Sequence, residues 1–338
     1  MMENSTIKSS RIYWIDALRF IAMFLVYIGH LGQSAGRIYG FVFLFHVPLF
    51  FFISGMFYKN SGTFSENAKA GFNKLIVPYF LYSVMSLAVY VLFLQKDVSQ
   101  VYPLMVQLVE AKRNFIEYAP QLWFLPCLFI VMLTFKALHM ISDSKIIIFI
   151  ICTASMIASI YIPQHPVSFA PQLPYGLDSA AYYIFWYCLG YLSKSKVVAF
   201  FDGNSFAVKS FFTGSMLFAA FCFFGLMAPF EAIITDVVGG KTYALLWTIP
   251  TLILFSACVP IAKALSVFKP VRYLGSNTLF LCGNEQIAKT TFIALIGISG
   301  HALNIGDEYY SFVYMSFLML LIYALKSKLE LWREKAPT

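Results

Sequence analysis

The first apolar stretch of the chain reads WIDALRFIAMFLVYIGH over residues 14–30. An acid, an arginine and a histidine, namely Asp16, Arg19 and His30, are set into it. Arg19 and His30 are eleven residues apart, about three turns of an α-helix. Both are therefore predicted to project from one face, about 16–17 Å apart along the axis. Asp16 lies three residues before Arg19 and shares that face.

These polar groups need an explanation if the helix crosses a bilayer, because an arginine at the centre of such a helix costs about 2.5–3.5 kcal/mol on insertion scales. Asp16 is the predicted partner of Arg19. In a structural interpretation, the two form an ion pair near the interface and His30 binds a carbonyl group. In a functional interpretation, His30 is a neutral general base and Arg19 orients an anionic group through paired hydrogen bonds. The sequence leaves both open.

The composition predicts an integral membrane protein. Of the 338 residues, 60% are hydrophobic and 12% are charged, whereas soluble domains have about 25% charged residues. The polar start leads into the first apolar stretch without a cleavage pattern, so we expect that stretch to remain as an anchor. The six cysteines lie inside apolar runs without a Cys-x-x-Cys spacing, which predicts buried hydrophobic side chains and no metal site.

Ten apolar runs have about the length needed to cross 30 Å of hydrocarbon. They lie near residues 13–33, 39–58, 75–95, 121–140, 145–162, 175–192, 207–228, 243–265, 276–299 and 309–326. The connections between them are short and leave no room for a separate soluble domain. The sequence therefore predicts an all-α bundle of about ten transmembrane helices that forms a single domain over residues 1–338.

The basic residues indicate the orientation. Seventeen of the 24 Lys and Arg residues fall at the amino terminus and in every second connection after it, five fall in the other connections, and Arg19 and Lys289 lie within spans. By the positive-inside rule both termini are predicted to be cytoplasmic. The net charge of +8 is thereby explained by the membrane, and no nucleic-acid partner is expected.

Two aromatic motifs carry further candidate residues. The run FHVPLFFFISG at 45–55 contains His46, which is predicted to enter the bundle from the same outer side as His30. A single membrane histidine is more often structural, but two facing histidines favour a site. The run LWFLP at 122–126 contains Trp123, which belongs either to an interfacial aromatic belt or to a substrate cavity.

Charged residues near the third and ninth spans are ambiguous in the same way. Lys69 and Lys74 serve either as positive-inside anchors or as a phosphate-binding site at the cytoplasmic mouth. Glu285 and Lys289 are four residues apart and can neutralise each other on one helix face. The neighbouring Asn284 favours a wet cavity over simple contact between helices.

Together these motifs resemble acyltransferase family 3, which includes bacterial membrane O-acetyltransferases that act on surface polysaccharides. The most specific elements are Asp16-Ala17-Leu18-Arg19 with His30, followed by the run PLFFFISG at 48–55. Two departures stand out. The family often has two arginines where this chain has Gly71 and Lys74, and often a histidine where it has Asn284-Glu285.

The resemblance implies a multi-pass enzyme of the bacterial inner membrane that transfers an acetyl or larger acyl group from cytoplasmic acetyl-CoA to a sugar hydroxyl. His30 is then the predicted base, with Arg19 holding the donor and Asp16 orienting Arg19. Lys69 and Lys74 would attract the coenzyme A phosphates. The acceptor cavity would be lined by His46, Trp123, Asn284 and Glu285.

Two other classes stay open at this point. A flippase for polyprenyl-linked glycans or a small-solute transporter would use the buried charges as a polar pathway, and a membrane scaffold would use them for packing alone. The spacing between Arg19 and His30 favours the enzyme. The sequence does not identify the acceptor sugar or the oligomeric state.

Overall fold

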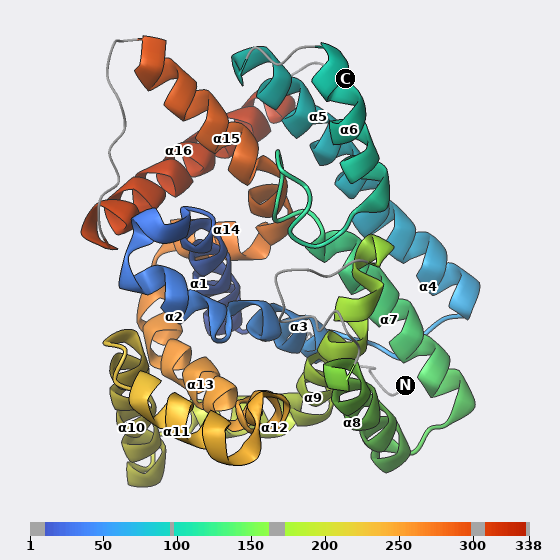
Figure 1. The fold of residues 1–338 in the computed structure, drawn as a ribbon, viewed down its shortest axis with the longest axis vertical. Helices are drawn as coiled ribbons and strands as arrows, with labels where there is room; N and C mark the ends of the chain where they lie inside the picture. Colours follow the sequence, from blue (N-terminus) through green and yellow to red (C-terminus); the bar gives the residue numbers. More distant parts are fainter. Residues whose placement is uncertain (1–10, 95–97, 162–172, 299–307, 336–338) are drawn as a thin grey trace, which may run out of the picture.

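The computed structural model describes residues 11–94, 98–161, 173–298 and 308–335 (Figure 1). Within these ranges the chain forms helices joined by turns, and none of the described residues lies in a β-strand. The predicted all-α fold is confirmed for this part of the chain.

The helices cover most of the described residues. They are α1 (Tyr13–Gly29), η1 (Gly32–Ala35), α2 (Arg37–Phe43), α3 (His46–Met56), α4 (Phe64–Gly71), η2 (Phe72–Ile76), α5 (Val77–Leu94), α6 (Val98–Glu110), α7 (Phe124–Ile141), α8 (Lys145–Tyr161), η3 (Pro174–Gly176), α9 (Leu177–Asp202), α10 (Phe206–Phe223), α11 (Ala228–Val238), α12 (Gly240–Leu246), α13 (Thr248–Leu265), α14 (Lys269–Ser276), α15 (Thr278–Ile298) and α16 (Glu308–Lys335).

Helix α1 is enclosed by its neighbours (Figure 1). It packs against α2, α3, α13, α14, α15 and α16. Ala17 and Ala22 are fully buried, and their small side chains allow this close packing. At the start of the helix, a side chain added at Gly275 of α14 would overlap the backbone carbonyl of Asp16. The helix that carries Asp16 and Arg19 and ends at His30 is thus fixed from several sides.

Helices α3 and α9 cross at a pair of glycines. A side chain at Gly55 would overlap the carbonyl oxygen of Tyr187 on α9, and one at Gly190 would overlap that of Phe52 on α3. Each glycine therefore faces the backbone of the other helix. Such contacts bring helices together where lipid provides no hydrophobic force between them, and they place Tyr187 beside α3.

Helix α4 starts with a capping box. The hydroxyl of Thr63 accepts a hydrogen bond from the backbone N–H of Glu66, whose carboxylate accepts one from the N–H of Thr63. The helix then continues through the π-helical turn η2 into α5. Lys74 lies within η2, and wide turns of this kind are frequent at functional sites.

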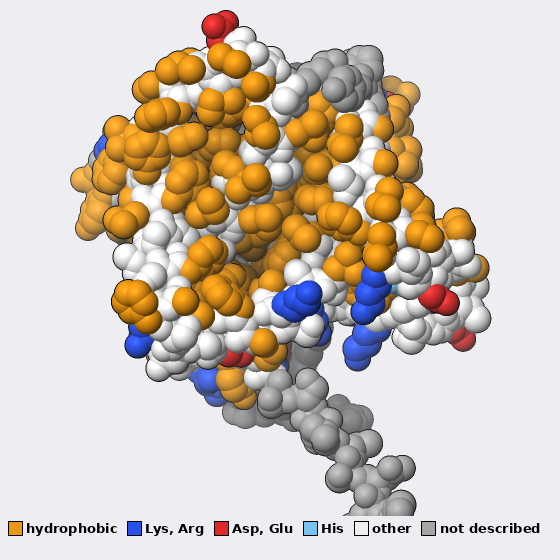
Figure 2. All heavy atoms as spheres, turned by 90° about the horizontal axis from the view of Figure 1, so that it is seen from below, with side chains coloured by type: hydrophobic (Ala, Val, Ile, Leu, Met, Phe, Trp, Pro, Cys, Tyr) orange, Lys and Arg blue, Asp and Glu red, His pale blue; other side chains and the backbone are white. Residues whose placement is uncertain are grey.

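The outer surface is strongly apolar. Leu92 and Ile141 are 75% and 79% exposed, and many other large hydrophobic side chains are also exposed. Hydrophobic side chains cover most of the face in Figure 2, while Lys and Arg side chains gather near its lower edge. A soluble protein rarely exposes so much contiguous apolar area, whereas lipid accepts it. The chain is therefore a multi-pass membrane protein.

Six helical segments among the described residues are long and apolar enough to cross a membrane. They are Arg37–Met56, Phe64–Phe93, Phe124–Ile141, Phe206–Phe223, Thr242–Leu265 and Glu308–Lys328. Each of the six overlaps one of the ten predicted spans. Because only six of the ten meet this criterion, the count of ten is not confirmed.

The other four predicted spans are also helices, but they differ in length or polarity. Helices α1 and α8 have 17 residues each, fewer than the roughly 20 that a span usually needs. Helices α9 and α15 contain polar groups such as Asp178 and Glu285, and both of these side chains are buried. Because neighbouring helices cover these groups, the segments need not be as apolar as a helix that faces lipid.

Candidate active site

A cavity of about 790 Å³ lies between the helices. Its wall combines residues of α1, α3, α5, α7, α9 and α15 with those of the connections before α4 and α7. The polar residues of the wall include Arg19, His30, His46, Lys59, Lys74, Gln121 and Thr278. The rest is mostly aromatic and aliphatic, which is typical of a ligand site with a few polar groups that set orientation.

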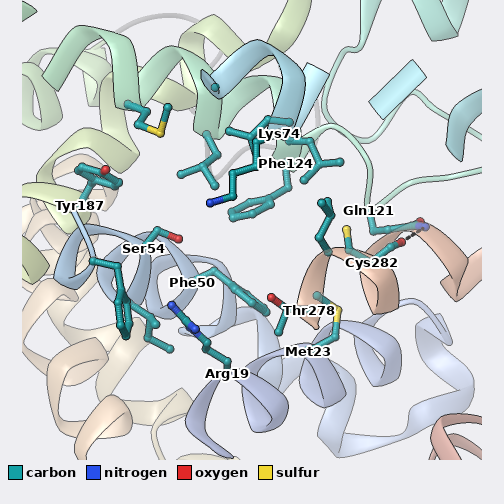
Figure 3. A pocket seen from close by; sticks show the side chains of 18 of the residues that line it. Arg19, Met23, Phe50, Ser54, Lys74, Gln121, Phe124, Tyr187, Thr278 and Cys282 are labelled. Atoms are coloured by element: carbon teal, nitrogen blue, oxygen red, sulfur yellow. Dashed lines mark hydrogen bonds between the residues drawn. The ribbon is translucent and has the colours of Figure 1, made fainter. Parts of the chain in front are cut away.

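Three cations line the cavity. Arg19 comes from α1, Lys59 from the connection after α3, and Lys74 from η2. In Figure 3, Arg19 and Lys74 point into the space from opposite sides. The guanidinium carbon of Arg19 lies 4.0 Å from the ring centroid of Phe57, and Lys194 Nζ lies 5.0 Å from that centroid. This group of basic side chains suits a ligand with several negative charges.

Asp16 lies behind Arg19 and outside the wall. Its side chain is buried, and its carboxylate lies 3.5 Å from Arg19 Nη1 and 2.6 Å from Arg11 Nε. The hydrogen bond to Asp16 raises the pKa of Arg11. Asp16 therefore contacts Arg19, its predicted partner, but its shorter contact is with Arg11.

His30 caps the carboxyl end of α1. Its Nδ1 lies 2.6 Å from Oε1 of Glu285 on α15. Lys289, one turn further along α15, donates a 2.6 Å hydrogen bond to the backbone carbonyl of His30. Tyr27 donates a 2.8 Å hydrogen bond to the carbonyl of Leu281. These contacts attach the end of α1 to α15 and hold the imidazole at the cavity wall.

His46 and Trp123 also line the cavity. His46 Nδ1 donates a 2.6 Å hydrogen bond to the carbonyl of Val42, so Nε2 is the ring nitrogen left for a ligand. Trp123 is buried, and the guanidinium of Arg113 lies 5.3 Å from its ring centroid. Beside them, Gln121 donates a 2.9 Å hydrogen bond to the carbonyl of Cys282 (Figure 3).

A comparison with protein-family models gives one match, described as an acyltransferase domain, over residues 12–281. This match spans about four fifths of the chain. The chain belongs to acyltransferase family 3. No curated protein and no solved structure matches it. The family match ends before Glu285 and Lys289, so the α15 residues that contact His30 in this acyltransferase lie beyond the matched part.

The predicted site residues of this acyltransferase divide into two groups. Those that line the cavity are Arg19, His30, His46, Lys74 and Trp123, and those that lie outside its wall are Asp16, Lys69, Asn284 and Glu285. Lys69 is exposed on α4. Asn284 donates its side-chain N–H to the carbonyl of Phe280 on its own helix.

The wall also contains polar residues that are not among the predicted site residues, and three of them are Lys59, Gln121 and Tyr187. Lys59 is one of the cations predicted to be cytoplasmic. Its position directly after the aromatic end of the second span is the sequence feature that could have identified it as a cavity residue. Gln121 is a buried amide next to the aromatic LWFLP motif, which is a second signal. Tyr187 lies in an aromatic run on α9, and no local pattern distinguishes it from its neighbours.

The arrangement brings basic side chains and two imidazoles together in one cavity. The basic residues suit phosphate groups, and His30 is the candidate proton acceptor. Among the residues that the structure describes, no group of three His, Cys, Asp or Glu side chains could hold a metal ion.

Proposed function

We propose that this protein is an O-acyltransferase of the bacterial inner membrane that transfers an acetyl group from cytoplasmic acetyl-CoA to a hydroxyl of a cell-surface sugar or polysaccharide. Membership of acyltransferase family 3 supports a membrane acyltransferase. The observation that carries the finer proposal is that one cavity contacts both the basic group and His30.

The proposed topology has ten spans and two cytoplasmic termini. Helices α1, α9 and α15 each pack against several neighbouring helices, and α8 packs along α9, which supports the inclusion of these four spans. Lys59, Lys74 and Lys194 lie in connections that the positive-inside rule predicts to be cytoplasmic. All three lie at or near the basic part of the cavity, so this part is the proposed entrance for the donor.

Coenzyme A would place its phosphates beside Arg19, Lys59 and Lys74. Its thin pantetheine arm would then run along α1 toward His30. The eleven residues from Arg19 to His30 correspond to about 16–17 Å of helix, a distance that the arm has to cover. The arm thereby links a cytoplasmic phosphate site to a reaction centre deeper in the membrane.

At that centre, Nε2 of His30 accepts the proton of the sugar hydroxyl while the hydroxyl oxygen attacks the thioester carbonyl carbon. The tetrahedral intermediate then collapses, and the carbon–sulfur bond breaks as the ester forms. The departing sulfur takes the proton back from the imidazolium and leaves as the thiol of coenzyme A. His46 and Trp123 would contact the acceptor sugar.

Transfer of radiolabelled acetyl from acetyl-CoA into the glycan fraction of membranes tests the proposal. Membranes that contain wild-type protein should incorporate label, and membranes with His30→Ala at matched protein levels should incorporate at most a small residual amount. Full incorporation with His30→Ala would reject His30 as the base. Solute flux in proteoliposomes without any labelled product would favour the transporter instead.

A further inference from the structure

We propose that Glu285 is a positioning residue for His30, which fixes its tautomer and stabilises the imidazolium formed during acyl transfer; this inference rests on the proposed function. Glu285 does not line the cavity, so it would act through the histidine and not on the substrate.

The geometry is that of a buried carboxylate behind an imidazole. Glu285 Oε1 lies 2.6 Å from His30 Nδ1, and the Glu285 side chain is 0% exposed. Its second oxygen is buried and has no hydrogen-bond partner among the described residues. A buried carboxylate is unfavourable unless it is paired. His30 Nδ1 is the hydrogen-bond partner that the structure gives to this carboxyl group, and the Lys289 side chain also interacts with it electrostatically.

The contact also decides which ring nitrogen is basic. An ionised carboxylate can only accept a hydrogen bond, so the proton of the neutral imidazole must lie on Nδ1. Nε2 then carries the free lone pair, and His30 lies at the cavity wall. When Nε2 takes a proton, the adjacent carboxylate stabilises the positive ring. The carboxylate of a serine-protease triad performs both tasks.

The other charged and titratable groups around His30 do not replace this contact. Lys289 directs its ammonium group to the backbone carbonyl of His30, and Tyr27 donates to the carbonyl of Leu281. His46 donates its Nδ1 proton to Val42. Glu285 is therefore the carboxylate that contacts the ring, although it lies 255 residues away in the sequence.

Kinetics of acetyl transfer by the purified full-length protein would test this role. Glu285→Gln keeps the volume and removes the charge, and it should lower kcat by about 10²- to 10⁴-fold, the usual contribution of general acid–base catalysis. KM for acetyl-CoA should stay within about twofold of wild type, because the basic residues that bind the donor are unchanged. Glu285→Asp keeps the charge and should retain more activity than Glu285→Gln.

Glu308→Gln is the matched control. It makes the same chemical change in a carboxylate that pairs with the exposed Arg37, and its kcat should match wild type. In the His30→Ala background, Glu285→Gln should lower the residual rate no further, because two residues that act as a unit are not additive.

The proposal is overturned if Glu285→Gln keeps the wild-type kcat, if Glu285→Asp is no better than Glu285→Gln, or if the double variant falls further than His30→Ala alone. These outcomes presuppose a wild-type protein that transfers acetyl groups. If the wild type transfers none, the proposed function itself fails, so the two failures are distinguishable.

Discussion

Arg11 and Arg19 contact the same carboxylate but differ in what else they can reach. Both approach Asp16, yet Arg19 alone of the two lines the cavity, where its guanidinium lies over the ring of Phe57. A guanidinium is planar, stacks on aromatic rings and forms paired hydrogen bonds with phosphate, whereas an ammonium is a compact point charge. The function of Arg19 should therefore depend on its shape as well as its charge.

Arg19→Lys is expected to lower kcat/KM for acetyl-CoA by about 10-fold or more, since a hydrogen bond to a charged group contributes about 1.5–3 kcal/mol. Steady-state kinetics of membranes with matched protein levels would measure this. Arg11→Lys is the control and should stay close to wild type, because Arg11 lies outside the wall. An equal loss of kcat/KM in Arg19→Lys and Arg11→Lys would show that the ion pairs of Asp16 affect only the stability of the protein.

Lys59 and Lys74 are expected to contribute more to donor binding than Lys69 does. The first two line the cavity and Lys69 does not. Lys59→Gln and Lys74→Gln should each raise KM for acetyl-CoA about 3- to 10-fold, and Lys69→Gln about twofold or less, because exposed charge pairs contribute only about 0–1 kcal/mol.

The salt dependence gives an independent check on these lysines. Contacts with phosphate weaken as salt screens them, so the difference between wild type and Lys74→Gln should shrink as ionic strength rises. A KM that is raised most by Lys69→Gln would contradict this placement of the donor.

At the residue scale, the sequence predicts which side chains share the face of one helix. Arg19 and His30 are on α1, and both line the cavity. The contact between His30 and Glu285 could not be predicted in this way, because it depends on how α1 and α15 pack. The spacing predicts that Glu285 and Lys289 neutralise each other, and they do interact electrostatically, but the ammonium group of Lys289 donates its hydrogen bond to the carbonyl of His30.

At the scale of elements, the crossing of α3 and α9 makes a sharp prediction. Gly55→Ala and Gly190→Ala would each force a methyl group into the backbone of the facing helix. Overpacking typically costs about 1–3 kcal/mol, and rigid backbone offers little relief. Both variants should melt at lower temperature in detergent and lose protein from the membrane.

Gly214→Ala on α10 is the control for this crossing. Nothing lies within 4 Å of a side-chain carbon added there, and alanine favours a helix interior over glycine by about 0.5–1 kcal/mol. Its melting temperature should equal or exceed that of wild type. If Gly55→Ala melts like Gly214→Ala, the two helices do not depend on this close approach.

The sequence predicts where the helices lie better than it predicts which of them cross the membrane on their own. Each of the ten apolar runs is helical, although the runs 39–58 and 243–265 are each divided between two helices, because hydrophobic runs of this length are strong signals. Four of those helices are not clear spans on their own, since α1, α9 and α15 bury polar groups inside the bundle and α8 is short. The π-helical turn that carries Lys74 has no comparable sequence signal.

At the scale of the whole molecule, apolar side chains fill the core and also cover much of the outer surface, while basic side chains and imidazoles gather at the cavity. The cavity holds cations and imidazoles, while the surface is covered with hydrophobic side chains (Figure 2). Such a protein has a defined orientation in the membrane. The proposed function requires the basic part of the cavity to open to the cytoplasm, where acetyl-CoA is made.

Two exposed serines test this orientation. Ser34 lies in η1, between the first two predicted spans, and Ser61 lies in the connection before α4 and lines the cavity. The six native cysteines are buried, so a thiol reagent that cannot cross membranes should label an introduced cysteine over a low background. Ser34→Cys should be labelled in intact spheroplasts.

Ser61→Cys should be labelled only in inside-out vesicles, because the proposed topology places residue 61 in the cytoplasm. Acetyl-CoA should slow its labelling, since the donor would occupy the part of the cavity beside Lys59 and Lys74. Labelling of Ser34→Cys should be indifferent to acetyl-CoA, which makes it the internal control. Labelling of Ser61→Cys in intact spheroplasts would reject the orientation, and labelling in vesicles without protection by acetyl-CoA would reject this entrance for the donor.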